Sequence, residues 1–120
     1  MFFLKKFLIL IFAFTFGNVA FAGDADFTVF NQTGYTINNL YVSPDNDNDW
    51  GKDILGKGYL NNRAKRLITF NKRSRQCVYD LKVIFEDGEE AEWQDFDLCT
   101  ISKITLKYDH KNGTTTATYE

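Results

Sequence analysis

Four aspartates in one polar segment are the residues whose type and spacing best suit a metal ion. Asp45, Asp47 and Asp49 occupy alternate positions, and Asp53 follows four residues later. Calcium takes about six to eight oxygen ligands, and alternating carboxylates in a loop can supply several of them. The EF-hand pattern is not met, because Trp50 stands where that loop requires glycine. The segment predicts a looser calcium site or, alternatively, a solvated turn that caps a short helical turn over residues 49–55.

A group of cations between residues 63 and 75 is the second candidate site. Such a patch could bind an anionic component of the cell envelope or an unknown acidic protein. Alternatively, the strand expected at 65–71 lies at the edge of a sheet, and its cations discourage edge-to-edge aggregation. The patch consists of Arg63, Lys65, Arg66, Lys72, Arg73 and Arg75, whereas the acidic residues Glu86, Asp87, Glu89, Glu90, Glu92, Asp95 and Asp97 gather farther along the chain.

Catalytic chemistry has one candidate base, since His110 is the single histidine of the chain. No serine stands in a Gly-x-Ser-x-Gly turn, and no His/Cys cluster has the spacing of zinc ligands. A hydrolase would have to join His110 to a distant serine or threonine, and nothing in the sequence indicates one. We therefore predict that the protein is not an enzyme and has no cofactor other than the calcium considered above.

The first 22 residues have the three parts of a secretory signal peptide. Lys5 and Lys6 precede an apolar run over residues 7–16, and a small-x-small cleavage site ends at Ala22. That run is shorter than the roughly 20 residues of a membrane span, and no later run is long enough to cross a bilayer. We expect residues 1–22 to be removed and residues 23–120 to form one domain in the periplasm or outside the cell.

The charge balance and the two cysteines narrow the class of protein further. Without the leader the chain carries 12 Lys and Arg against 16 Asp and Glu, and this mild acidity argues against nucleic-acid binding. Cys77 and Cys99 lie in a small exported domain, where two cysteines most often pair. A bridge over such a loop would contribute about 3 kcal/mol. Two buried free thiols are the alternative.

Short strands separated by turn residues dominate the rest of the pattern. Aromatic and β-branched residues are frequent, and no long stretch has a helical apolar period. Residues 76–86 alternate most clearly, with Cys77, Tyr79, Leu81, Val83 and Phe85 on the expected core face. The pattern predicts seven strands, at 26–31, 35–43, 65–71, 76–86, 89–96, 101–110 and 114–119.

Two dipeptides predict hairpins, because Asp87-Gly88 and Asn112-Gly113 tolerate the positive φ angles of a two-residue turn. Phe96 falls out of step with Trp93, which indicates a bulge near residues 94–95. These features together predict an all-β fold, a small antiparallel β-sandwich of about seven strands with one disulfide. A small β-barrel is the alternative.

Several motifs taken in order resemble those of a widespread group of small exported bacterial all-β proteins of unknown function. The resemblance covers nearly the whole chain after the leader. It implies a shared all-β domain with the two cysteines paired, and it implies no activity, cofactor or catalytic residue. The motifs are Phe30-Asn31-Gln32-Thr33-Gly34, Leu40-Tyr41-Val42-Ser43-Pro44, Trp50-Gly51-Lys52-Asp53-Ile54-Leu55-Gly56, Cys77-Val78-Tyr79-Asp80, Asp87-Gly88 and Leu98-Cys99.

Three functional hypotheses follow. The leading one is an exported, non-enzymatic binding module. The alternative is a calcium-dependent binding module that uses the segment from Asp45 to Asp53. A hydrolase based on His110 is the third.

Overall fold

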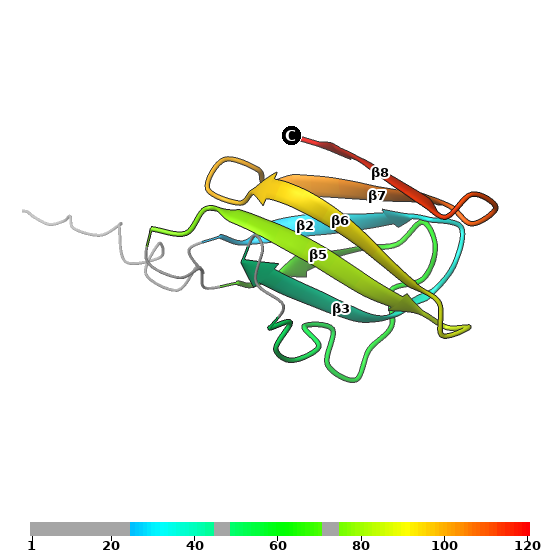
Figure 1. Cartoon of the computed structure of the whole chain (residues 1–120). Helices are drawn as coiled ribbons and strands as arrows, with labels where there is room; N and C mark the ends of the chain where they lie inside the picture. Colours follow the sequence, from blue (N-terminus) through cyan, green and yellow to red (C-terminus); the bar gives the residue numbers. More distant parts are fainter. Residues whose placement is uncertain (1–24, 45–48, 71–74) are drawn as a thin grey trace, which may run out of the picture.

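The computed structural model describes residues 25–44, 49–70 and 75–120, which form an all-β sandwich (Figure 1). The described residues contain no helix, and their two sheets stay separate rather than closing into a barrel. The predicted fold class is therefore confirmed, whereas the short helical turn expected at 49–55 is wrong, since these residues form non-helical turns. The strands are β2 (Phe27–Gln32), β3 (Ile37–Pro44), β4 (Lys65–Ile68), β5 (Val78–Phe85), β6 (Glu90–Asp97), β7 (Lys103–Asp109) and β8 (Thr114–Tyr119).

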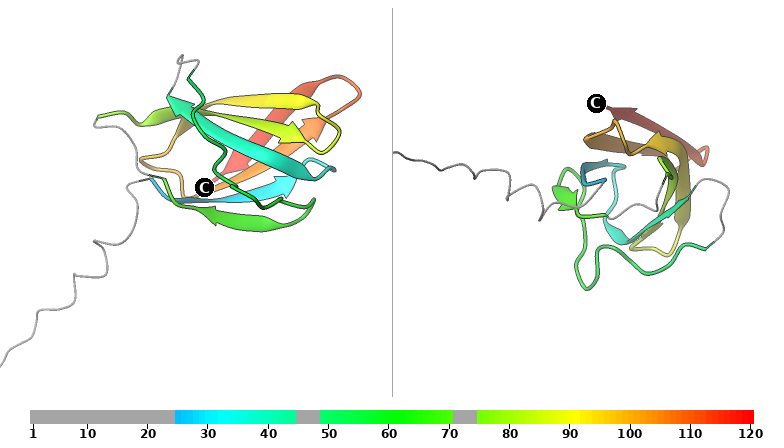
Figure 2. Two further views of the ribbon diagram at one scale, coloured as in Figure 1. Left: turned by 90° about the horizontal axis from the view of Figure 1, so that it is seen from below. Right: turned by 90° about the vertical axis from the view of Figure 1, so that its left-hand side faces the viewer.

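The strands form one four-stranded sheet in the order β4-β2-β7-β8 and one three-stranded sheet in the order β3-β5-β6 (Figure 2). All adjacent pairs are antiparallel except β2 and β7, which run parallel with Val29 opposite Ile104. This one pair departs from the antiparallel prediction. Hairpin dipeptides specify only neighbouring strands, so no local signal marks the pairing of strands so far apart in the chain.

Both predicted hairpins are present, but neither is the two-residue turn that the dipeptides predict. Ile84 pairs with Glu90 and Asp109 with Thr114, so both loops are longer, and neither Asp87 nor Asn112 has a positive φ. Asp87-Gly88 joins β5 to β6, Gly88 has a φ of 89°, and Phe85 N–H donates to Glu89 O at 2.9 Å. The loop through Gly113, with a φ of 71°, joins β7 to β8. Glycine has no Cβ atom, so Gly88 and Gly113 adopt these positive φ angles at little cost in conformational energy.

The predicted bulge is also confirmed. The register of β5 and β6 shifts between Tyr79 and Leu81, and Asp95 opposite this shift has a φ of 68°. The buried carboxylate of Asp80 accepts the Asp95 N–H at 3.0 Å, so it satisfies a backbone donor that the shifted ladder leaves over.

The core lies between the two sheets. The alternating residues Tyr79, Leu81, Val83 and Phe85 of β5 are at most 1% exposed, as the sequence predicts. Apolar side chains of β2 and β7 cover them from the other sheet. Burial of this set supplies the main driving force for folding.

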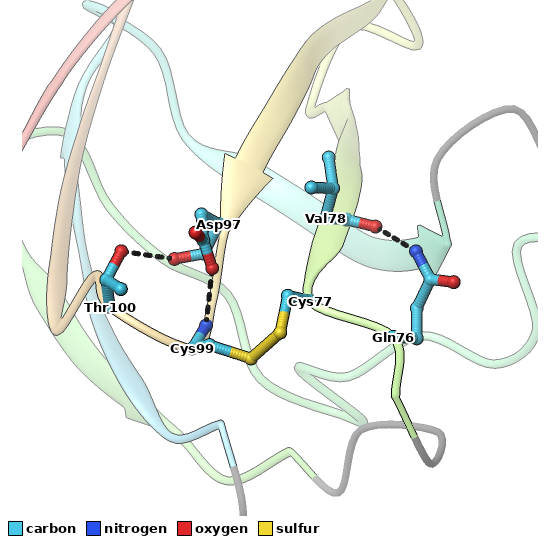
Figure 3. Close-up of a disulfide and its surroundings, with 6 residues drawn as sticks. All are labelled: Gln76, Cys77, Val78, Asp97, Cys99 and Thr100. Carbon is cyan, nitrogen blue, oxygen red and sulfur yellow. Dashed lines mark hydrogen bonds between the residues drawn. A yellow bond between two sulfur atoms is a disulfide. The ribbon is translucent and has the colours of Figure 1, made fainter.

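The Cys77–Cys99 disulfide ties the start of β5 to the segment after β6 (Figure 3). The Cα atoms lie 5.3 Å apart, and Leu98 N–H donates to Cys77 O at 2.9 Å beside the bridge. The predicted pairing is confirmed, and the alternative of two free thiols is excluded.

Segment 49–60 runs along the outer edge of β3. Ile54 N–H donates to Leu40 O at 2.8 Å, and Ile37 and Leu60 exchange two backbone hydrogen bonds of 2.9 Å. The segment therefore covers an edge that would otherwise be open to pairing with another chain.

Candidate functional site

The outer face of the four-stranded sheet gathers four cations in the described structure, three of them exposed and one, Lys103, partly buried. Phe27 and Val29 of β2 point into the core, so Thr28, Phe30 and Gln32 point outward. These three residues define the outer face, and the strand register shows which side chains of β4 and β7 share it.

The register places three lysines on this face. Lys65 of β4 lies opposite Phe30, Lys103 of β7 opposite Thr28, and Lys107 of β7 opposite Gln32. Arg63, in the turn before β4, lies beside Phe30 and Gln32. We call Arg63, Lys65, Lys103 and Lys107 the cationic face. Neighbouring strands lie about 4.8 Å apart, so the register groups these charges on one face of the sheet.

A hollow of about 460 Å³ lies at one end of the cationic face. It offers a guanidinium group, two side-chain amides and an aromatic ring to a ligand. Two backbone contacts shape it: Gly34 N–H donates to Asn62 Oδ1 at 2.9 Å, and Arg63 N–H donates to Asn31 O at 2.6 Å. Arg63 has a φ of 71°, so the turn projects this residue from the sheet edge. The hollow is lined by Phe30, Gln32, Gly34, Asn62 and Arg63.

Few acidic groups neutralise the cationic face. Lys103 Nζ lies 3.8 Å from Glu120 Oε2 and 5.7 Å from the centroid of the Phe30 ring. Asp109 ends β7 near the loop. The acidic residues 86–97 that the sequence groups together belong instead to the β5–β6 hairpin, in the other sheet. The acidic hairpin and the cationic face therefore belong to different sheets of the described structure, although Asp109 shares β7 with Lys107, and Lys82 of β5 lies 3.9 Å from Glu90.

The predicted cation patch is divided by the fold. Arg66 points away from the cationic face: its guanidinium donates to Leu55 O and Tyr59 O, both at 3.3 Å, and packs against Gly58. It holds segment 49–60 in place. Arg75 is exposed just before β5, and Lys72 and Arg73 lie outside the described residues.

Lys103 and Lys107 were missed by reasoning from the sequence. They are four residues apart on a strand, so they share one side of it. The sequence shows this spacing, but Lys103 and Lys107 come to lie near Lys65 only because β2 pairs in parallel with β7. Because that pairing has no local signal, the sequence could not bring the two groups of cations together.

The aspartates of the predicted calcium site are only partly described. Asp53 Oδ1 accepts Leu40 N–H at 2.9 Å and Leu55 N–H at 3.0 Å, and its Oδ2 accepts Asn39 Nδ2 at 2.9 Å. The two donors from β3, Leu40 N–H and Asn39 Nδ2, fix segment 49–60 to that strand, and the Leu55 N–H bond shapes the segment itself. Asp49 Oδ1 accepts Gly51 N–H at 3.2 Å.

Asp45 and Asp47 lie outside the described residues, so calcium binding by this segment stays a prediction. The described residues bring together one group of three candidate metal ligands, Cys77, Asp97 and Cys99, within 4.8 Å of one another. Its two sulfurs are joined in the disulfide (Figure 3), and Asp97 Oδ1 accepts Cys99 N–H at 3.0 Å. A metal needs thiolates from cysteine, and the oxidised pair supplies none.

His110 is packed into an aromatic cluster rather than presented to solvent. Its Nδ1 lies 3.1 Å from Glu89 Oε1, and its Nε2 is buried without a hydrogen-bond partner among the described residues. The rings of Tyr35, Phe85 and Tyr108 surround it, with centroids 3.4, 5.0 and 4.3 Å away. The imidazole thus joins three loops at one end of the sandwich, and a hydrolase based on it stays a prediction.

Tyr108 completes this cluster. Its hydroxyl donates to Glu89 Oε2 at 2.7 Å. This hydrogen bond and the negative charge of Glu89 favour the protonated phenol, so they raise the pKa of Tyr108 above its ordinary value. The contact stabilises the fold between the β5–β6 hairpin and β7.

The Asn31-Gln32-Thr33-Gly34 motif also has a structural explanation. Buried Asn31 donates its Nδ2 hydrogens to Tyr35 O at 2.8 Å and Leu60 O at 2.9 Å. Its Oδ1 accepts the Thr33 N–H at 2.9 Å and the Thr33 hydroxyl at 2.6 Å. The motif therefore locks the β2–β3 turn and anchors the end of segment 49–60.

Comparison with known proteins supports the fold. No family model and no curated protein matches the chain. A protein from Eubacterium rectale with an NMR structure is similar, with a TM-score of 0.56 and 14% sequence identity. The similarity covers 79% of this chain and 86% of that one. Among the described residues, no helix is long and apolar enough to span a membrane.

Proposed function

We propose that the protein is an exported, non-enzymatic binding module whose cationic face binds an anionic partner. The observation that carries the proposal is the convergence of Arg63, Lys65, Lys103 and Lys107 on one sheet face, with the acidic cluster on the other sheet. A field of one sign over one face attracts and orients a partner of the opposite sign.

The contacts of other polar residues support this choice of face. Asp53, Arg66 and Asn31 use their polar groups to hold loops in place. Lys65 and Lys107, by contrast, are exposed to solvent. Export is supported by the disulfide, since such bridges persist in oxidising compartments.

A polyanion titration tests the proposal. The probe is fluorescent poly-L-glutamate, and binding is followed by anisotropy at low and at physiological salt. We expect the double variant Lys65→Gln/Lys107→Gln to bind about twofold to thirtyfold more weakly, at about 0.2–1 kcal/mol for each of the two exposed charge pairs. Added salt should weaken the wild-type protein more than the variant.

Lys57→Gln/Arg75→Gln is the matched control, because it removes two exposed cations that belong to the other sheet's side of the fold, Lys57 in segment 49–60 beside β3 and Arg75 just before β5. It changes the net charge by the same amount and should bind as the wild-type protein does. Equal loss in both double variants would mean that only net charge matters, and the proposal would then be wrong.

A further inference from the structure

The outer edge of β4 carries backbone groups that no described residue pairs with. Segment 49–60 covers β3. On the opposite side of the sandwich, Trp93 of β6 donates its Nε1–H to Thr116 O of β8 at 2.8 Å, so the edges of β6 and β8 face each other. β4 is the remaining outer strand. An uncovered edge is a template for pairing with another strand.

Three residues of this edge direct their backbone groups outward. Asn31 N–H donates to Ala64 O at 2.9 Å, and Ala25 N–H donates to Phe70 O at 3.0 Å. Even-numbered residues from 64 to 70 therefore face β2, and the N–H and C=O groups of Lys65, Leu67 and Thr69 face away. No hydrogen bond from another described residue reaches these outward groups.

The two sides of the β4 edge differ in chemistry. On the outer side lie the cation Lys65 and the apolar Leu67, whose exposed fraction is 63%. Near the end of the strand a groove of about 320 Å³ offers a mostly apolar lining. Lys82 Nζ lies 5.2 Å from the Trp50 ring in its wall, which holds that ring in place. The groove is lined by Val42, Trp50, Gly51, Lys52, Ile54, Thr69 and Phe70.

We propose that an extended, acidic segment of a partner protein adds to β4 as a further strand. This inference rests on the proposed function, because it names the partner of the cationic face. Alternate residues of the segment would place carboxylates toward Lys65 and Arg63, and apolar side chains toward the groove. Backbone hydrogen bonds to residues 65, 67 and 69 provide the pairing.

Charge complementarity favours an acidic partner over a second copy of this chain. A second β4 at the same edge would add its own Arg63 and Lys65 to a surface that already carries these two cations. Like charges gathered on one surface oppose association. A segment rich in glutamate or aspartate meets the same cations with the opposite sign.

The test uses an end-capped ten-residue peptide of alternating glutamate and valine, titrated by isothermal calorimetry into the purified protein. Leu67→Pro removes an outward N–H that β2 does not use, so the fold should tolerate it. We expect Leu67→Pro to lose at least about tenfold in affinity through the lost bond and the bulk of the ring. Leu67→Thr, which keeps the N–H and a strand-forming side chain, should stay within about threefold.

Two isomeric peptides keep the test decisive if Leu67→Pro does not fold. One carries N-methyl groups on every glutamate nitrogen, the other on every valine nitrogen. In an added strand only one of these sets faces β4, so one isomer should lose binding to the wild-type protein and the other should keep it. Equal binding of both isomers would overturn strand addition.

The remaining outcomes separate this inference from the proposed function. Leu67→Pro could bind the peptide as tightly as the wild-type protein does, while Lys65→Gln/Lys107→Gln binds it more weakly. That result would overturn strand addition and leave the cationic face as a binding site. Unchanged affinity in all variants would overturn both. A wild-type dimer in sedimentation that Leu67→Pro converts to a monomer would make a second copy the occupant, and would overturn the acidic partner.

Discussion

At the residue scale, the polar side chains that stand out in the sequence divide into those that hold the fold and those that face solvent. Asp53 and Asn31 each satisfy several backbone groups of neighbouring segments. The sequence does not identify the partners of these side chains. A carboxylate such as that of Asp53 can bind either a metal ion or a backbone N–H. Lys65 and Lys107 keep their charge exposed on the sheet.

Asp53→Ala tests the structural role of this carboxylate. We expect the free energy of unfolding to fall by about 2–3 kcal/mol, because the variant leaves two partly buried backbone donors without their acceptor. Asp53→Asn keeps an oxygen for the Leu40 and Leu55 amides and should lose less. The measurement is urea unfolding followed by tryptophan fluorescence, and a loss below about 0.5 kcal/mol in Asp53→Ala would contradict the role.

Tyr108 makes stability depend on pH at the alkaline end. Its pKa is raised in the folded state, so the unfolded chain loses the phenol proton at a lower pH than the folded one. The stabilisation is present below about pH 10, the ordinary tyrosine value, and is lost as pH rises through the raised folded value. Above about pH 10 we expect the wild-type protein to lose stability more steeply than Tyr108→Phe. Tyr59→Phe, at an exposed position, is the control and should follow the wild-type slope.

At the element scale, local signals account for what could be predicted. Asp87-Gly88 and the loop through Gly113 end strands with distinctive turn chemistry, and alternation over residues 78–85 identifies the core face. The parallel pairing of β2 with β7 depends on packing of distant segments, and no short window contains it. For this reason the sequence predicted Arg63 and Lys65 as part of a cationic patch, but not Lys103 and Lys107.

The disulfide, which joins the start of β5 to the segment after β6, was predicted correctly from the sequence. We expect Cys77→Ala/Cys99→Ala to unfold with a free energy about 3 kcal/mol lower than the oxidised wild-type protein, because the bridge restricts the unfolded chain. Urea unfolding with and without reductant measures the difference. Under reductant, the unfolding curves of the two proteins should nearly coincide. If the oxidised wild-type protein has the same urea midpoint as the variant, the bridge adds no stability.

At the scale of the whole molecule, the residues that stabilise the fold and the residues proposed to bind a partner lie in different parts of the described structure. The core, the disulfide and the loop contacts lie within and between the sheets, whereas the cationic face lies on the outside of one sheet. Net charge conceals this arrangement, because the chain as a whole is slightly acidic. Topology, rather than composition, concentrates the cations where a partner could reach them.

Chemical-shift mapping by NMR tests the central claim most directly. The ¹⁵N-labelled protein is titrated with poly-L-glutamate, and the backbone amides are followed residue by residue. If the cationic face binds the polymer, we expect salt-sensitive shifts in residues 28–32, 63–67 and 103–107, with the β5–β6 hairpin unchanged. Shifts that leave these three stretches still, while another surface responds, would contradict the claim.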